Sequence, residues 1–280
     1  MSMMETSAYE EKKEYLHTRM GELTKENVAV AFSGGVDSSL LLKLAVLHAK
    51  ENSTEVFAYT AKTELHPMQD LDISLKIAKE IGVELHVIEI DELKEAGIEN
   101  NPKERCYFCK RFIFQSMIES AKQKGVRVFL EGTNIDDTKV YRPGLKALEE
   151  LEIISPLKEA AMTKAEVRKM AAEYEITTAS RPSTPCMATR FPYGTKLTVE
   201  NLKKVEEGET FLRSLGFYNV RLRVHENIAR LEIDVEAFET VLSRREEIVK
   251  ALKELGYDYV TLDLVGFRSG SMDEPIGMKK

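Results

Sequence analysis

The chain has 280 residues and a net charge of −7, with 43% hydrophobic and 31% charged residues. This composition is typical of a globular protein, and an acidic total argues against a broad basic face that grips nucleic acid. The sequence has no run of about 18 apolar residues and no apolar signal-peptide core near its start, so we expect no membrane association and a cytoplasmic location.

The first half of the chain predicts strands that alternate with helices. Such alternation is typical of an α/β fold with a doubly wound parallel sheet, which binds ligands at the carboxyl ends of its strands. Strands are expected at 28–32, 55–60, 85–90 and 126–130, with 151–154 as a candidate fifth, and helices at 38–50, 68–81 and 103–124. Thr163 and Glu166 have the spacing of a helix capping box.

The second half predicts a different architecture. Prolines exclude a regular helix or central strand from the stretch 181–195, which also carries Cys186 and Arg190. A plain linker needs neither residue, so we interpret this stretch as a functional loop. A small α+β domain should follow, with helices at 198–215 and 235–255, a hairpin at 220–233 and a strand at 259–264. The expected domains are therefore 1–180 and 196–280, joined by the loop 181–195.

The most informative segment runs from Ser33 to Ser39, with the sequence SGGVDSS between a predicted strand and a predicted helix. Glycines let the backbone approach an anion, and a helix N-terminus directs N–H groups at it. An ordinary Ser/Gly helix cap is the alternative. The segment lacks the lysine of the GxxxxGK[ST] loop and resembles the PP-loop of ATP pyrophosphatases. It predicts a pyrophosphate site made by Ser33, Gly34, Gly35, Ser38 and Ser39. Asp37 would help to place Mg²⁺ or order the loop; the alternative is an ordinary carboxylate that the helix dipole favours at a helix N-terminus.

The sequence has three cysteines, and an odd number does not suggest a disulfide framework. Cys106 and Cys109 are spaced to share one face of the predicted helix, and Cys186 lies in the proline-rich loop. From spacing alone the pair is compatible with a redox site, half a zinc site, two buried thiols, or, together with Cys186, a 4Fe–4S cluster with one open iron.

Taken together, the motifs at 33–39, 131–137, 141–144, 185–194, 221–225 and 266–271 resemble the LarE family. These are ATP-dependent sulfur transferases that build the nickel-pincer nucleotide cofactor. The resemblance implies a PP-loop (adenine nucleotide alpha hydrolase-like) fold. It also implies adenylation of a carboxylate of pyridinium-3,5-biscarboxylic acid mononucleotide by ATP with Mg²⁺, followed by conversion to a thiocarboxylate.

The resemblance also implies roles for individual residues. Cys186, Asp37 and Ser38 would be catalytic, and further ATP contacts would come from Ala58, Thr60, Gly132, Thr133 and Asp137. Substrate anions would meet fork-shaped donors at Arg190, Arg221, Arg223 and Arg268. The three cysteines resemble a branch in which a 4Fe–4S cluster carries a removable sulfide, whereas another branch sacrifices the cysteine at the Cys186 position. The family further implies a homo-oligomer, a hexamer assembled through the C-terminal domain.

Other classes of protein share some of these features. A tRNA thiolase also joins a PP-loop to cysteines and a cluster, although the acidic total and the lack of an evident RNA-binding appendage argue against it. A synthetase domain of the GMP or NAD synthetase type uses ammonia and needs no cysteines. An ATP-binding regulatory module would leave the Cys186 loop unexplained.

Overall fold

The computed structural model describes residues 3–139, 142–178, 185–268 and 270–274. The chain forms two compact units. The first comprises 1–63, 68–96 and 106–184, and the second comprises 64–67, 97–105 and 185–280. The boundary expected between residues 180 and 181 lies outside the described residues. None of the described helices combines the length and apolar character of a membrane span.

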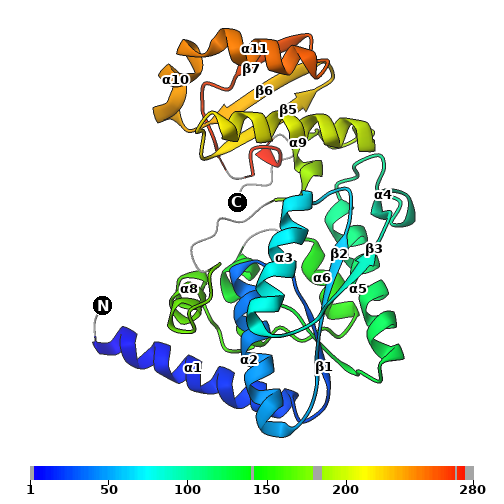
Figure 1. Cartoon of the computed structure of the whole chain (residues 1–280), viewed down its shortest axis with the longest axis vertical. Helices are drawn as coiled ribbons and strands as arrows, with labels where there is room; N and C mark the ends of the chain where they lie inside the picture. Colours follow the sequence, from blue (N-terminus) through cyan, green and yellow to red (C-terminus); the bar gives the residue numbers. More distant parts are fainter. Residues whose placement is uncertain (1–2, 140–141, 179–184, 269, 275–280) are drawn as a thin grey trace. The chain divides into compact units, whose positions relative to one another are not determined.

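The first unit is built on a parallel sheet with the strand order β3-β2-β1-β4 (Figure 1). The strands are β1 (Val28–Ala31), β2 (Val56–Lys62), β3 (Leu85–Glu89) and β4 (Val128–Leu130). This order confirms the predicted parallel sheet. A fifth strand at 151–154 was the wrong expectation, because that stretch adds only one bridge, between Ile154 and Leu130. The left-handed backbone of Glu152, with φ at 55°, interrupts an extended run there.

Helices cover both faces of this sheet, as a doubly wound fold requires. Val28 and Val30 of β1 pack into one core, together with helices α1, α2 and α8, whereas Ala29 packs into the other core with α5. The helices of this unit are α1 (Met3–Leu23), α2 (Val36–Asn52), α3 (Met68–Ile81), α4 (Glu92–Glu95), α5 (Arg105–Gln123), α6 (Gly144–Glu150), α7 (Pro156–Glu159) and α8 (Lys164–Glu173). The polar N-terminal sequence did not predict α1. The capping box of α8 is confirmed, with Thr163 and Glu166 bonded reciprocally.

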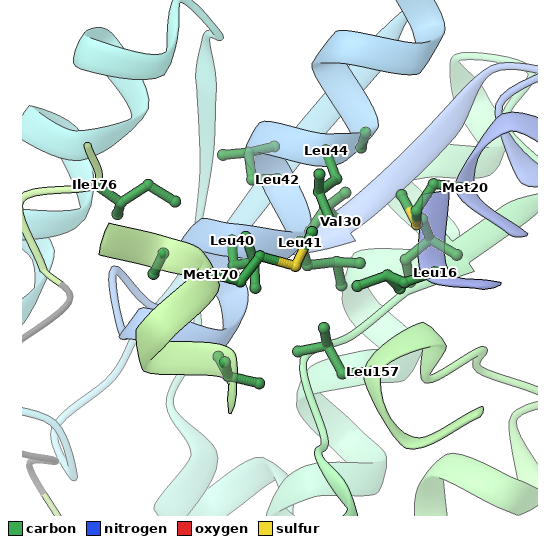
Figure 2. Close-up of a cluster of buried hydrophobic side chains, with 14 of the residues drawn as sticks. Leu16, Met20, Val30, Leu40, Leu41, Leu42, Leu44, Leu157, Met170 and Ile176 are labelled. Atoms are coloured by element: carbon green, nitrogen blue, oxygen red, sulfur yellow. The ribbon is translucent and has the colours of Figure 1, made fainter. Parts of the chain in front are cut away.

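Figure 2 shows why α2 carries a continuous apolar run. Leu40, Leu41 and Leu42 are all fully buried, so α2 packs apolar side chains on more than one of its faces there. Side chains of α1 and α8 surround it, among them Leu16 and Met170. The helix that follows the glycines of the SGGVDSS turn is therefore packed on more than one side, which gives the turn a rigid support.

The second unit contains an antiparallel hairpin extended by a parallel strand. The strands β5 (Val220–His225), β6 (Ile228–Ile233) and β7 (Tyr259–Leu262) lie in that order. The helices are α9 (Val199–Ser214), α10 (Phe238–Ser243) and α11 (Arg245–Glu254). The hairpin and the α+β character are as predicted, but the helix expected over 235–255 is interrupted. Arg244 leaves helical geometry at φ −104° and ψ 16°, and its side chain bonds the carbonyl of Leu215.

The topology of the first sheet defines where a ligand should bind. The chain steps outward from β1 to β2 and β3, and then returns to place β4 on the other side of β1. In such sheets the ligand crevice lies at the carboxyl ends of the two strands where the order reverses. Here those strands are β1 and β4, which lead into Ser33–Ser39 and into Glu131–Asp137.

A polar chain connects three helical segments of the first unit. The hydroxyl of Tyr174 lies 2.9 Å from Nε2 of His17, and Nδ1 of His17 lies 2.9 Å from Nε2 of His48. Glu51 accepts at the remaining nitrogen of His48, at 3.0 Å. Burial lowers the pKa of His17, and the neighbouring His48 and Lys13 lower it further.

This network predicts a loss of stability in mild acid. Because the pKa of His17 is lower in the folded chain than in the unfolded chain, the unfolded chain binds the proton first as the pH falls below about 6.5. The free energy of unfolding should then fall by at most about 1.4 kcal/mol per pH unit for this one proton.

Chemical denaturation of wild type and His17→Gln between pH 5 and 8 measures the effect. The variant should show the weaker pH dependence in this range. Paired carboxylates such as Glu166 and Glu173 have lowered pKa values, so their losses belong to more acidic solutions. Identical pH profiles for the two proteins would contradict the assignment to His17.

Candidate active site

The SGGVDSS turn joins β1 to α2 with the geometry of an anion-binding loop. Gly34 has φ at +65°, a conformation that favours glycine, and Gly35 is the N-cap of α2. The hydroxyl of Ser38 donates to the Gly35 carbonyl at 3.1 Å and accepts from the Ser33 amide at 3.3 Å. The turn thus fixes its own shape, and the first turn of α2 offers unsatisfied N–H groups.

Close backbone packing holds this turn against its neighbours. A Cβ on Gly132 would lie 2.9 Å from the amide nitrogen of Ser38 and 3.1 Å from the backbone carbon of Asp37. A Cβ on Gly34 would lie 2.9 Å from the hydroxyl of Ser74 on α3. The motifs that follow β1 and β4, which lie about one hundred residues apart, therefore meet backbone to backbone at the switch point.

Asp37 is the centre of a polar cluster at this edge. Its carboxylate accepts from the side-chain amide of Asn134 at 3.0 Å and forms an ion pair with the ammonium of Lys164. Lys164 is the first residue of α8, and its backbone amide donates to Asp136 at 2.8 Å. A cation from a distant helix therefore stands beside the turn, although the turn itself lacks a lysine.

The segment after β4 is held by its own carboxylates. Glu131 is buried and accepts from the amide of Thr133 at 3.0 Å and from its hydroxyl at 2.7 Å, and it also accepts from Ser155. Asp137 accepts from the amide of Asn134 at 3.1 Å and pairs with Arg142 at 2.9 Å. Thr133 is therefore committed to shaping this loop.

The remaining predicted ATP contacts lie deeper in the sheet. Ser39 is fully buried, and the hydroxyl of Thr178 donates to it at 3.3 Å. Ala58 is also fully buried within β2, opposite Val30 of β1, and Thr60 is nearly so. Ser39, Ala58 and Thr60 are therefore buried, and their contact with ATP stays a prediction.

The paired cysteines lie at the start of α5 in the first unit. Cys106 is exposed and Cys109 partly exposed, one helical turn apart. Gly144 packs on this turn, because a Cβ there would lie 2.8 Å from Cδ of Lys110 and 3.3 Å from the Cys106 carbonyl oxygen. Burial lowers the pKa of Lys110, whereas Glu131 and Asp137 act to raise it. The cysteine turn thus shares its electrostatic surroundings with the Glu131–Asp137 loop.

Cys186 begins a short helical turn in the second unit. Its carbonyl oxygen accepts from the hydroxyl of Thr189 at 2.8 Å and from the guanidinium of Arg190 at 3.2 Å. The next residue, Met187, donates its amide to the carbonyl of Leu65 at 2.9 Å. The residue is partly exposed, while its backbone is held by these hydrogen bonds.

Arg190 holds this loop through a buried ion pair. Its Nε and Nη2 lie 2.8 and 2.9 Å from the two carboxylate oxygens of Glu209, and both side chains are almost fully buried. Burial acts to raise the pKa of Glu209, but Arg190 and Arg213 hold it below its usual value. Arg190 is therefore fully engaged within the protein and does not line the pocket described next.

A pocket that opens to solvent, with a cavity volume of about 90 Å³, lies within the second unit. The arginines in its wall are Arg105, Arg221, Arg223 and Arg268, and Asp273 is the acidic residue there. Arg221 and Arg223 both reach it from β5, as their spacing of two residues predicts. The wall is completed by aromatic and small residues, among them Phe191, Tyr193 and Phe267.

These arginines differ in whether a carboxylate of the protein lies close enough to neutralise their positive charge. Arg223 pairs with buried Glu232 at 2.9 Å, and Arg268 pairs with Asp263 and Glu274. Arg221 instead lies 5.1 Å from the ring centroid of Phe267, with no carboxylate at ion-pair distance among the described residues. Burial and nearby arginines lower the pKa of Arg221 to about 10. An anion in the pocket would relieve this excess of positive charge.

The cysteines suit an iron–sulfur cluster by donor chemistry. All three cysteine residues are exposed or partly exposed, and thiolates are the usual ligands of such clusters. Within the part of the chain that the structure describes, no three His, Cys, Asp or Glu side chains gather closely enough to hold a metal ion.

Comparison with known proteins identifies the family. The profile of the PP-loop domain matches residues 5–140. Pyridinium-3,5-bisthiocarboxylic acid mononucleotide synthase of Lactiplantibacillus plantarum is 37% identical over 252 residues, which cover 90% of each chain. This chain belongs to the LarE family. It is an ATP-dependent sulfurtransferase with a PP-loop domain.

Two further relatives match the LarE-family chain over most of its length. An uncharacterised protein of Synechocystis is 34% identical over 266 residues, covering 94% of this chain and 97% of that protein. A second one, from Methanocaldococcus jannaschii, is 34% identical over 244 residues, covering 87% and 92%. Both units of the structure therefore have counterparts in these relatives.

Sequence reasoning missed several residues of this LarE-family site. Lys164 lies between Thr163 and Glu166 of the predicted capping box, and nothing in its local sequence indicates the ion pair with Asp37. Arg105 was overlooked beside the CxxC spacing, although it lies in the pocket wall with Arg221 and Arg223. Both residues reach their sites from elements distant in sequence, so only the fold shows them.

The contact at Gly132 gives a testable prediction. In Gly132→Ala, the new Cβ would meet the backbone of Asp37 and Ser38, so the turn must shift by a few tenths of an ångström. Overpacking of this kind costs about 1–3 kcal/mol, and we expect ATP affinity to fall roughly tenfold. Calorimetric titration with ATP and Mg²⁺ measures the change.

Gly21→Ala in α1 is the matched control, because its Cβ would meet only His48 at an ordinary 3.8 Å. The control should bind ATP like wild type. Unchanged ATP affinity in Gly132→Ala, with a normal fold by circular dichroism, would contradict the placement of ATP at this turn.

Proposed function

We propose that this LarE-family enzyme adenylates a carboxylate of pyridinium-3,5-biscarboxylic acid mononucleotide and converts it to a thiocarboxylate in nickel-pincer nucleotide biosynthesis. The observation that carries the proposal is the arginine pocket of the second unit, in a chain whose first unit holds a PP-loop. The substrate has a phosphate and two carboxylates, and guanidinium groups are matched to both kinds of anion.

In this proposal the first unit supplies the chemistry of adenylation. A carboxylate oxygen attacks the α-phosphorus of ATP, the bond to the β-phosphate breaks, and pyrophosphate leaves. N–H groups at the start of α2, with Ser33 and Ser38, would bind the pyrophosphate. Lys164 would transfer its ion pair from Asp37 to a phosphate, which releases Asp37 to bind Mg²⁺.

The second unit would recognise the substrate. Arg221 is the best placed anion contact, since aromatic packing orients it and the described residues leave it without a paired carboxylate. Arg223 and Arg268 would add contacts while staying oriented by Glu232 and Asp263. We assign Arg190 a positioning role, because its pair with Glu209 fixes the loop that carries Cys186.

Sulfur transfer would follow adenylation. A sulfur nucleophile attacks the acyl carbon, and AMP leaves with the electron pair of the acyl–oxygen bond. Cys106, Cys109 and Cys186 would hold a 4Fe–4S cluster, which when bound would supply a removable sulfide. The exposed or partly exposed cysteine residues support this assignment, as do the charged surroundings of Lys110, on which Glu131, Asp137 and Cys106 all act. The alternative is sacrifice of Cys186 as the sulfur source.

We also propose a homo-oligomer, a hexamer by family resemblance. Large apolar side chains of the second unit are exposed, including Leu264 at 82%, Val265 at 65%, Leu242 at 59% and Val235 at 54%. Apolar groups in such number are typical of surfaces that associate with another chain. Sedimentation of the purified protein would show the assembly.

Arg221 provides the direct test of substrate recognition. Arg221→Gln removes one charge-assisted contact, worth about 1.5–3 kcal/mol, so affinity for the pyridinium mononucleotide should fall roughly ten- to hundredfold. Affinity for ATP should be unchanged, because the PP-loop belongs to the other unit. Calorimetric titration of each ligand measures the two affinities.

Arg245→Gln is the matched control, an exposed arginine of the same unit that forms an ion pair with exposed Glu246. If Arg221→Gln binds the pyridinium mononucleotide as tightly as wild type does, the assignment of the arginine pocket as the substrate site is contradicted. Incubation with ATP and either the pyridinium mononucleotide or unmodified tRNA tests the substrate class, and thiolation of tRNA alone would replace the proposed function with that of a tRNA thiolase.

Cys106 separates the two sources of sulfur. If all three thiolates hold a cluster, Cys106→Ala should lose both bound iron and thiocarboxylate formation when purified without oxygen. Ser116→Ala on the same helix is the control and should keep both. Iron analysis and mass spectrometry of the product measure the effect. One thiocarboxylate per protein from Cys106→Ala, with loss of H₂S from Cys186, would instead show sacrifice.

A further inference from the structure

Arg105 occupies an unusual position in the second unit. Its side chain is only 3% exposed and forms part of the wall of the arginine pocket. The guanidinium carbon lies 5.5 Å from the ring centroid of Tyr193, and Nη1 donates to the side-chain oxygen of Asn101. The Tyr193 hydroxyl in turn donates to Asp273 at 2.9 Å. The guanidinium is therefore oriented on two sides, which suits a planar donor that binds an oxyanion.

Asn101 fastens this arginine to the end of the Cys186 loop. Its side-chain amide donates to the carbonyls of Phe191 at 3.1 Å and Pro192 at 2.8 Å, and its own carbonyl accepts from the amide of Gly194 at 3.0 Å. It is fully buried and adopts φ at +47°, a left-handed conformation that asparagine tolerates. The segment that carries Arg105 is thus fastened through the buried Asn101, and also through the Glu99 carbonyl, which accepts from the amide of Leu197 at 2.6 Å.

Arg105 is also the first residue of α5, whose next residue is Cys106 and whose next turn carries Cys109. The first turn of a helix has few internal hydrogen bonds, so it opens more easily than the middle. A restraint on Arg105 acts through the peptide bond on the turn that presents both thiols. The residue therefore belongs at once to the pocket and to the start of the cysteine helix.

We infer that Arg105 binds an anionic group of the substrate in the arginine pocket and thereby orders the first turn of α5, which positions Cys106 and Cys109. The inference rests on the proposed function, since it requires the pocket to take a phosphate or carboxylate. Arg105 is then a contact for the anion and a positioning residue for the thiols. Substrate binding would restrain the cysteine pair before sulfur transfer, because the same residue meets both.

Amide hydrogen exchange of the full-length protein tests this coupling. The probes are inorganic phosphate, nicotinate and nicotinate mononucleotide, each at a concentration that saturates wild type by calorimetry. Exchange in the peptide 105–112 should slow about fivefold or more in wild type, the lower end of typical coupling free energies. Protection by phosphate and by the mononucleotide but not by nicotinate assigns the phosphate group, and protection by nicotinate as well assigns a carboxylate.

The variants separate the coupling from binding itself. Arg105→Gln should still bind the mononucleotide through Arg221 and Arg223, more weakly, but should lose the protection of α5 at saturation. Arg111→Gln is the matched control, an exposed arginine on the same helix that contacts Tyr107, and should keep the protection. If Arg105→Gln does not fold, Asn101→Gly keeps the left-handed backbone, removes the side-chain bonds, and should show the same loss.

Two results would overturn the inference alone: ligand binding to wild type with unchanged exchange in 105–112, or full protection retained in Arg105→Gln. A wild-type protein that binds none of the three probes, and does not bind the pyridinium mononucleotide, would overturn the proposed function together with the inference. Binding of the mononucleotide that depends on Arg221 but not on Arg105 leaves the proposed function intact and removes Arg105 from it.

Discussion

One buried carboxylate organises the second unit. Glu209 of α9 accepts from Arg190 at both oxygens, from Arg213 at 2.6 Å, and from the backbone amide of Leu222 at 3.1 Å. A helix, a strand and the Cys186 loop therefore converge on a single charge. Removing one partner of such a pair typically costs about 3–5 kcal/mol, because the other charge is left buried. The loop that carries Cys186 is consequently held through the buried side chain of Arg190.

In the first unit, close backbone packing rather than a buried charge holds the functional turn. Its ATP turn must stay accessible to an anion and must still be rigid. Gly34 and Gly132 allow α3 and the loop after β4 to approach the turn without intervening side chains. The cation that the turn lacks is delivered by the N-terminus of α8, a segment that the capping box of Thr163 and Glu166 fixes in place. Phosphate chemistry and rigidity thus come from separate elements that meet at the switch point of the sheet.

Local pattern predicted much of this fold. The parallel strands, the capping box and the hairpin follow from periodicities that each segment carries by itself. The misses have a common cause, which is information that lies outside the segment. The strand expected at 151–154 fails on the left-handed backbone of Glu152, and the helix over 235–255 is interrupted at Arg244, whose side chain bonds back to Leu215. At the site, the spacing of Arg221 and Arg223 predicts that both side chains lie on one face of a strand. The burial of Arg190 against Glu209 could not be predicted, because Arg190 and Glu209 belong to different elements.

The second unit is not a continuous stretch of chain, and this has a consequence for synthesis. Residues 64–67 and 97–105 belong to it. Leu65 of the first segment bonds Met187, and Asn101 of the second bonds Phe191, Pro192 and Gly194, all of which come about 90 residues later or more. On the ribosome these early segments emerge before their partners have been synthesised. Until then the side-chain amide of Asn101 has none of these partners to bond. The second unit cannot be completed until its last strand, β7, has been made, and a fragment that starts at residue 185 would lack two of its own pieces. The order of translation therefore makes the arginine pocket a late product of folding, formed after the strands of the ATP sheet have all been made.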